Sequence, residues 1–275
     1  MKYYRLTPAF SMLELIFVIV ILGIVASIGS EMVARVYEGY IVQRAQHRAT
    51  LKTELAATQI ANRLASAIPG TVYRIKNDDS YESIEADLTG TDGDNYKGLQ
   101  WVGSDTDSFS ASTIPGWSGF CDLNISTKTT LSTPGSDLAL TNAIIARLSN
   151  GTGTKNISNA AIYFPEEKEN TELNIATGTG ELFTLDSNAT RMVEHYKLAW
   201  SSYALMVDGG DLYLYYNFTP TPAVAITNNT PRSLLMRNVT TFKFKGAGRT
   251  IRFKICKQEP ISEDVNITAC KEKAV

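Results

Sequence analysis

The chain has 275 residues, of which 26 are basic and 28 acidic, so its formal net charge is −2. This near-neutral balance, with 44% hydrophobic residues, is typical of a globular protein and gives no indication of a general nucleic-acid binder. The two histidines, His47 and His195, are too few for a His-based triad or metal cluster. The sequence also holds no Walker, Rossmann, Gly-x-Ser-x-Gly or Cys-x-x-Cys motif, so we expect neither an enzyme nor a cofactor or metal site.

The N-terminus combines a short basic segment with a long apolar run. Lys2 and Arg5 precede a run from Phe10 to Ile28 in which Glu14 is the only charged residue. About 20 apolar residues are needed to cross a bilayer, and this run is roughly that long. The positive-inside rule keeps the basic segment in the cytoplasm and sends the bulk of the chain outward. A carboxylate this deep in an apolar segment is costly without a partner, so Glu14 is a candidate functional residue.

Three interpretations of this N-terminus compete. The first is a secretory signal peptide with a small-residue cleavage site at Val25-Ala26-Ser27. The second is a plain single-pass anchor. The third is a class III leader that is cut between Ala9 and Phe10 on the cytoplasmic side, with the whole apolar helix retained.

Glu14 favours the third interpretation. An acid weakens a secretory signal, and a plain anchor has no use for it. Cleavage before Phe10 creates a free α-amine four residues from Glu14. In an assembly of staggered parallel helices, the amine of one subunit could pair with Glu14 of its neighbour and offset the cost of burying both charges.

These features resemble the type IV pilin and pseudopilin family. The resemblance lies in the basic leader, the small residue Ala9, the first mature residue Phe10, the fifth mature residue Glu14 and the unbroken apolar run. It implies that a prepilin peptidase cleaves before Phe10 and N-methylates it, and that Glu14 acts in assembly. It also implies as partners other pilin or pseudopilin subunits and an inner-membrane assembly platform. The family usually has Gly before the cut, where this chain has Ala9.

The helical pattern continues beyond the apolar run. Between Ser30 and Ile68 there is no proline and one glycine, Gly39, and apolar residues recur at helical spacing between charged ones. Pro69-Gly70 is a strong stop signal. We therefore expect a rod from Phe10 to Ile68, roughly 90 Å long at 1.5 Å per residue.

The remaining residues divide by composition. Residues 70–160 are rich in Gly, Ser, Thr, Asn and Asp and predict loops and short strands, with a short surface helix over Asp137–Leu148. From residue 161 the pattern becomes β, with hairpins centred on Asp208-Gly209-Gly210-Asp211 and Gly246-Ala247-Gly248. We expect an α+β protein in which the outer half of the helix packs on an antiparallel sheet. The expected segments are a leader (1–9), a transmembrane half-helix (10–29), an amphipathic half-helix (30–69), a variable region (70–160) and a sheet domain (161–275).

The sheet region resembles, more weakly, the J-type minor pseudopilins and related minor pilins. The resemblance lies in the order of a hairpin over Tyr203–Tyr216, then Arg232-Ser233-Leu234-Leu235, then Val239–Phe244. It implies a minor subunit of a secretion or pilus filament.

The cysteines predict one disulfide. Cys256 and Cys270 close a small C-terminal loop, a region that pilin-like proteins often staple, and such a bridge constrains the unfolded chain by roughly 3 kcal/mol. Strand alternation points Cys256 away from the core, together with Arg252 and Lys254. Cys121 is left over, and we expect a buried free thiol rather than an intermolecular bridge.

Two surface features have a functional and a plain interpretation. The basic residues of the second hairpin could contact an acidic partner, DNA or lipid, although a solvated sheet face is the simpler interpretation; they are Lys243, Lys245, Arg249, Arg252 and Lys254. Three asparagines stand in Asp-x-Asn-x-Ser/Thr sequences that resemble bacterial glycosylation acceptors, although chance accounts for them as well; they are Asn124, Asn188 and Asn266.

We therefore expect a pilin-like subunit with a single inner-membrane span, whose C-terminal domain lies in the periplasm or in a filament. The filament would serve protein secretion, motility, adhesion or DNA uptake. The alternative is a membrane-tethered extracellular binding module or adhesin that does not polymerise.

Overall fold

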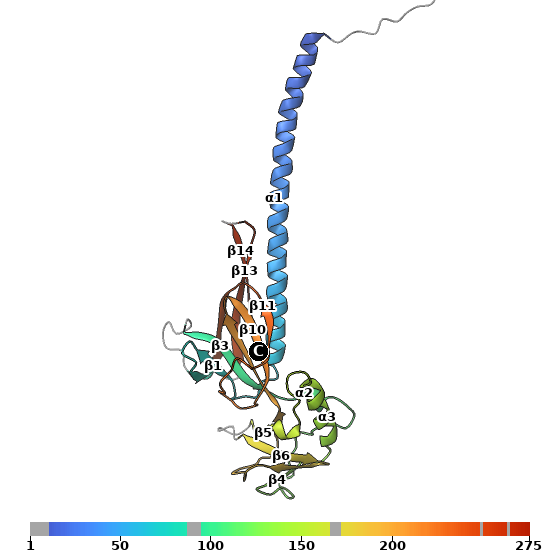
Figure 1. The fold of residues 1–275 in the computed structure, drawn as a ribbon, viewed down its shortest axis with the longest axis vertical. Helices are drawn as coiled ribbons and strands as arrows, with labels where there is room; N and C mark the ends of the chain where they lie inside the picture. Colours follow the sequence, from blue (N-terminus) through green and yellow to red (C-terminus); the bar gives the residue numbers. More distant parts are fainter. Residues whose placement is uncertain (1–10, 87–94, 166–171, 248–249, 263–264) are drawn as a thin grey trace, which may run out of the picture.

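The protein is an α+β molecule built from one very long helix and antiparallel sheets, as expected from the sequence. The computed structural model describes residues 11–86, 95–165, 172–247, 250–262 and 265–275. In Figure 1 the N-terminal part of the helix stands free as a rod, and the remaining chain gathers around and beyond its other end.

The long helix is α1 (Met12–Leu64), with 53 residues and a length of about 80 Å at 1.5 Å per residue. Ser11 caps it, since its Oγ accepts a hydrogen bond from the backbone N–H of Glu14. The helix ends four residues before the expected Ile68. The chain leaves it there because the backbone N–H of Ile68 donates to Val102 O in a neighbouring strand.

The largest sheet has six strands in the order β11-β10-β9-β3-β1-β2, and every pairing in it is antiparallel. Its strands are β1 (Tyr73–Lys76), β2 (Tyr81–Ser83), β3 (Tyr96–Gly103), β9 (Ser201–Asp208), β10 (Asp211–Phe218) and β11 (Arg232–Met236). The hairpin between β9 and β10 is confirmed. Gly209 and Gly210 both have positive φ there, as a two-residue type I′ turn requires.

A second sheet has three antiparallel strands in the order β12-β13-β14. They are β12 (Val239–Ala247), β13 (Thr250–Pro260) and β14 (Asn266–Ala274). The hairpin of β12 and β13 is confirmed, and its predicted inward side chains are buried: Phe242, Phe244, Ile251, Phe253 and Ile255.

The second half of α1 packs against both sheets. Its buried side chains form a stripe at helical spacing: Ala49, Thr53, Ala56, Ala57, Ile60 and Leu64. The last four of them share one core with Leu99 and Trp101 of the six-stranded sheet and with Phe253 and Ile255 of the three-stranded sheet. We call this part of the molecule, α1 from Ala49 onward with the two sheets, the body.

The chain between β3 and β9, residues 104–200, forms a separate unit that we call the head. It contains a five-stranded antiparallel sheet of order β4-β7-β6-β5-β8, the helices α2 (Thr106–Phe109) and α3 (Leu138–Leu148), and a short 3₁₀ helix, η2 (Ile157–Asn159). Its strands are β4 (Thr130–Ser132), β5 (Ala161–Tyr163), β6 (Leu173–Thr179), β7 (Leu182–Leu185) and β8 (Lys197–Ala199). Figure 1 shows the head at the end of the molecule farthest from the start of α1.

The head has its own hydrophobic core, with Trp117, Leu131, Phe183 and Tyr196 among its buried members. Because Gly103 and Ser201 are directly paired in the antiparallel sheet, the chain leaves and re-enters the body at one point. In both units some strands precede residue 160, where the composition of the sequence changes, and other strands follow it. The predicted helix over Asp137–Leu148 is confirmed as α3, with Asp137 as its N-cap.

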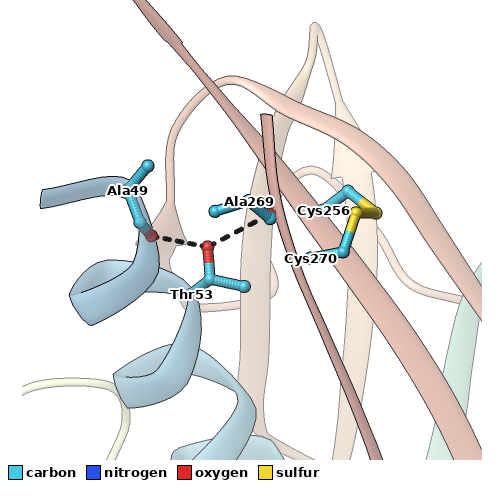
Figure 2. Close-up of a disulfide and its surroundings, with 5 residues drawn as sticks. All are labelled: Ala49, Thr53, Cys256, Ala269 and Cys270. Atoms are coloured by element: carbon cyan, nitrogen blue, oxygen red, sulfur yellow. Dashed lines mark hydrogen bonds between the residues drawn. A yellow bond between two sulfur atoms is a disulfide. The ribbon is translucent and has the colours of Figure 1, made fainter. Parts of the chain in front are cut away.

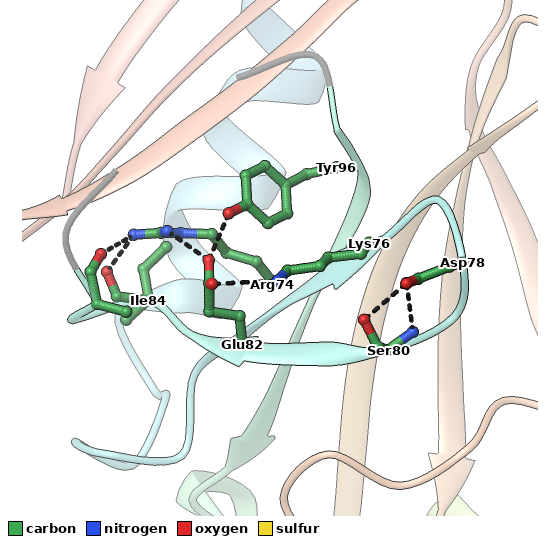
Figure 3. Close-up of polar contacts among 8 residues, drawn as sticks. Arg74, Lys76, Asp78, Ser80, Glu82, Ile84 and Tyr96 are labelled. Carbon is green, nitrogen blue, oxygen red and sulfur yellow. Dashed lines mark hydrogen bonds and ion pairs between the residues drawn. The ribbon is translucent and has the colours of Figure 1, made fainter. Parts of the chain in front are cut away.

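A buried arginine organises the β1–β2 edge of the body (Figure 3). The Arg74 side chain is 1% exposed and donates to Glu82 Oε2 at 3.0 Å and to the carbonyl oxygens of Ile84 and Ala86, both at 2.7 Å. The Tyr96 hydroxyl also donates to Glu82. These bonds satisfy acceptors that the loop after β2 would otherwise bury without partners.

Candidate assembly surface

The first half of α1 is uncovered along its whole length. Every described side chain from Met12 to Arg44 is exposed in the isolated chain. The helix is long and apolar enough to cross a membrane, and none of its most apolar stretch is buried within the protein. A bilayer about 30 Å thick accounts for the residues up to about Ile28.

Beyond that membrane-length run, apolar side chains continue on one side of the helix. They lie at i, i+4 spacing and are 45–70% exposed: Met32, Val33, Val36, Tyr37, Tyr40 and Ile41. We call these six residues the apolar stripe. It lies between the membrane-length run and the body, which first covers the helix at Ala49. Contiguous exposed apolar surface of this kind marks an interaction site.

Glu14 lies in the first turn of α1, where a negative charge is favourable to the helix dipole. Its backbone N–H is satisfied by Ser11, and its carboxylate has no hydrogen-bond or ion-pair partner in the part of the chain that the structure describes. Ala9 and Phe10 lie outside the described residues. The pairing of the Phe10 amine with Glu14 of a neighbour therefore stays a prediction.

The body holds α1 through charged contacts with β14 that the sequence did not reveal. Glu54 lies 2.6 Å from Lys271 Nζ and 2.9 Å from Lys273 Nζ. Hydrogen bonds from these two lysines lower the pKa of Glu54 from 4.5 to about 2. Lys273 also donates to Thr58 Oγ1 at 2.7 Å. The one sequence feature that could have indicated these contacts is the i, i+2 spacing of the lysines, which places both on one strand face.

Next to these contacts, the predicted disulfide is confirmed (Figure 2). Cys256 of β13 and Cys270 of β14 are direct register partners with a Cα–Cα distance of 4.0 Å. The bridge closes the expected C-terminal loop, which folds as the β13–β14 hairpin. Thr53 Oγ1, which bonds to Ala49 O at 2.7 Å, reaches Ala269 O beside the bridge at 3.5 Å.

Two details of the cysteine predictions can be checked. Cys256 shares a strand face with the exposed Arg252 and Lys254, as predicted, but is itself buried where it bonds to Cys270 of β14. Cys121 is a buried free thiol, as expected, and burial raises its pKa.

The other predicted surface residues are accessible. Asn124, Asn188 and Asn266 are all exposed, and their glycosylation stays a prediction. The described basic residues of the second hairpin, Lys243, Lys245, Arg252 and Lys254, are also exposed. Among the described residues, no group of three or more His, Cys, Asp and Glu side chains could hold a metal ion.

No protein-family model matches this chain, and no curated protein or solved structure matches it either. The architecture itself, a long apolar N-terminal helix packed on an antiparallel sheet, is compatible with a pilin-like protein.

Proposed function

We propose that the chain is a minor pilin or pseudopilin, a structural subunit of a type IV pilus or type II secretion filament. The observation that carries this proposal is the apolar stripe, which extends past the membrane-length part of α1. A plain membrane anchor needs no apolar side chains there. Parallel helices of neighbouring subunits would cover the stripe and bury it in the centre of a filament.

Glu14 has the assembly role in this proposal. The subunit is inserted in the inner membrane as a precursor, trimmed before Phe10 by a prepilin peptidase and N-methylated there. The methylated amine stays charged and pairs with Glu14 of an adjacent subunit. Because both charges find a partner only in the polymer, a carboxylate in an apolar helix becomes a condition for assembly.

The head supports a minor, tip-located subunit rather than the repeating one. It holds nearly 100 residues at the end of the molecule away from the start of α1. The same feature also favours the alternative function, a tethered binding module that does not polymerise. The two functions differ in whether the N-terminus is processed and in whether Glu14 is needed for association.

Mass spectrometry of the N-terminal peptide from native membranes tests the proposal. We expect a peptide that begins at N-methylated Phe10. An intact leader would support the tethered module, and a start near Ile28 would indicate a secreted protein; either result would overturn the proposal.

A variant tests the role of Glu14 independently. We expect Glu14→Ala to be inserted in the membrane but to be lost from the sheared or purified filament fraction. Glu31→Ala is the matched control, because Glu31 lies on the same exposed helix and pairs with Arg35 one turn away. Normal co-assembly of Glu14→Ala would contradict the pairing mechanism.

A further inference from the structure

A furrow of about 530 Å³ lies between the last turns of α1 and the edge of the six-stranded sheet. Gln59 and Arg63 of α1 form one wall, and Ser233, Leu234 and Leu235 of β11 form the other. Tyr203, Leu214 and Tyr216 of the adjoining strands and Leu148 of the head also line it. The furrow is thus built by all three parts of the molecule: helix, sheet and head.

The backbone of β11 is open toward this furrow. β11 is the terminal strand of its sheet and pairs only with β10 among the described strands. The N–H of Tyr216 donates to Pro231 O, which makes Tyr216 and Pro231 a hydrogen-bonded pair. Since such pairs alternate along an antiparallel ladder, Ser233 bonds to Leu214. The N–H and C=O groups of Arg232 and Leu234 therefore point away from β10.

β11 is a short edge strand of five residues that carries two leucines. Leu234 is 40% exposed and Ser233 is exposed, so both side chains stay accessible although α1 lies across the furrow. Proteins normally protect such edges, because they are templates for another strand. The edge of β14, by comparison, is bordered by α1, where Thr53 donates to Ala269 O.

An adjoining cavity of about 540 Å³ adds negative charge to one end of the furrow. The two share Gln59, Arg63, Asp107 and Tyr203. Asp105, which lines the adjoining cavity, is 3% exposed, and its Oδ2 has no hydrogen-bond partner among the described residues. The Arg63 guanidinium lies over the Tyr203 ring, 5.7 Å from its centroid. Two carboxylates against the one guanidinium of Arg63 give this end one net negative charge when both acids are ionised, and burial raises the pKa of Asp105.

We propose that the furrow binds an extended polypeptide segment of a partner protein, which adds to β11 as a further strand of the six-stranded sheet. Main-chain hydrogen bonds to Arg232 and Leu234 give the affinity, and alternate side chains occupy the furrow. An apolar side chain packs beside Leu234 and Leu235, and a lysine or arginine side chain reaches Asp105 and Asp107. This binding does not depend on filament formation, so it stands or falls separately from the proposed function.

The test uses a phage-displayed library of random linear peptides, selected on the detergent-solubilised full chain. Selected peptides are synthesised and their affinity is measured by fluorescence anisotropy. Leu234→Pro removes one outward N–H and leaves the ladder to β10 intact, a position at which edge strands tolerate proline. Leu234→Ala is the matched control, because it removes the side chain and keeps the N–H.

We expect Leu234→Pro to weaken the selected peptides at least about tenfold and Leu234→Ala to weaken them less. We also expect the peptides to be enriched in a basic residue whose contribution is lost in Asp107→Asn but kept in Asp186→Asn, an exposed control on the head. Unchanged affinity for Leu234→Pro, or a library that yields no binding peptide, would overturn the proposal.

Hydrogen exchange on the wild-type chain guards against misfolding of the proline variant. A bound peptide should slow exchange of the Arg232 and Leu234 amides and leave the Ser233 amide, already bonded to β10, unaffected. Protection elsewhere, without protection at these two amides, would place the peptide outside the furrow and overturn the proposal.

Discussion

Glu54 joins the long helix to the strand β14 through two ion pairs. Its pKa is lowered from 4.5 to about 2 by Lys271 and Lys273, so the folded state favours the ionised carboxylate. A depressed pKa contributes stability above the unfolded value, and this contribution is lost as the pH falls from about 4.5 to about 2. We therefore expect Glu54→Gln to lower the unfolding temperature at neutral pH. The difference in unfolding temperature between variant and wild type should become smaller as the pH approaches 2.

Glu194→Gln is the matched control for this measurement, since Glu194 is exposed on the head and away from α1. Thermal unfolding followed by circular dichroism over that pH range checks the prediction. If the unfolding temperatures of Glu54→Gln and wild type differed by the same amount at all pH values, the ion pairs would not contribute to stability.

Arg74 is a second residue with a large expected effect. Its guanidinium is buried and donates to one carboxylate and two carbonyl oxygens, so Arg74→Met leaves several acceptors without their donor. We expect a loss of about 3 kcal/mol, as is usual when one partner of a buried charged network is removed. Urea unfolding measures this, with the exposed Arg237→Met as control. A loss as small as that of the control would mean that water replaces Arg74.

At the scale of elements, the disulfide fastens β14 to β13 and so keeps β14 beside α1. Its removal by Cys256→Ser with Cys270→Ser frees a loop with a sequence separation of 14, which corresponds to roughly 3 kcal/mol of loop entropy. We expect the double variant to unfold at a lower temperature and to expose β14 amides to faster hydrogen exchange than β12 amides. Equal exchange in both strands would indicate that the bridge does not hold β14.

The sequence predicted the elements whose apolar residues follow a clear period. The long helix, the two hairpins and α3 all have this property, and all are present. β14 was expected as a loop. Its partly buried face begins with Ile267 and Ala269 but continues with Lys271 and Lys273, which pair with Glu54 rather than fill a core. The apolar alternation is therefore too short to indicate a strand.

The head escaped prediction for a different reason. Its core collects Trp117, Leu131 and Phe183 from short segments separated by polar loops, and no single window shows their periodicity. For the candidate assembly surface, the disulfide indicated by the sequence is confirmed, whereas the cleavage position and the role of Glu14 stay predictions. The furrow beside β11 could not be predicted, since it depends on a sheet order that brings helix, edge strand and head together.

At the scale of the whole molecule, the head enters and leaves the body at the directly paired residues Gly103 and Ser201. Replacing residues 104–200 by Asn-Gly would join β3 to β9 through a two-residue hairpin turn. We expect the shortened chain to keep the Cys256–Cys270 bridge and to unfold cooperatively, with a smaller denaturant m-value because less surface is exposed on unfolding. Guanidinium unfolding checks this.

The small core that joins the head to the body sets the expected cost. Ile68 and Val102 pack there against Tyr163 and Ala199. Removal of the head exposes these two body residues, so we expect the shortened chain to have a lower free energy of unfolding than wild type. Loss of the cooperative transition would show instead that head and body fold as one unit.

The contact between α1 and β14 also has a consequence for how the protein is made. Thr53 of α1 and Ala269 of β14 are 216 positions apart. The part of α1 around Thr53 therefore leaves the ribosome long before β14, which covers it. Pairing across such a separation is slow, because the loop must close before any contact rewards it. During this interval the helix presents apolar surface that no strand yet covers. Folding of this part of the molecule therefore waits for the last strand of the chain.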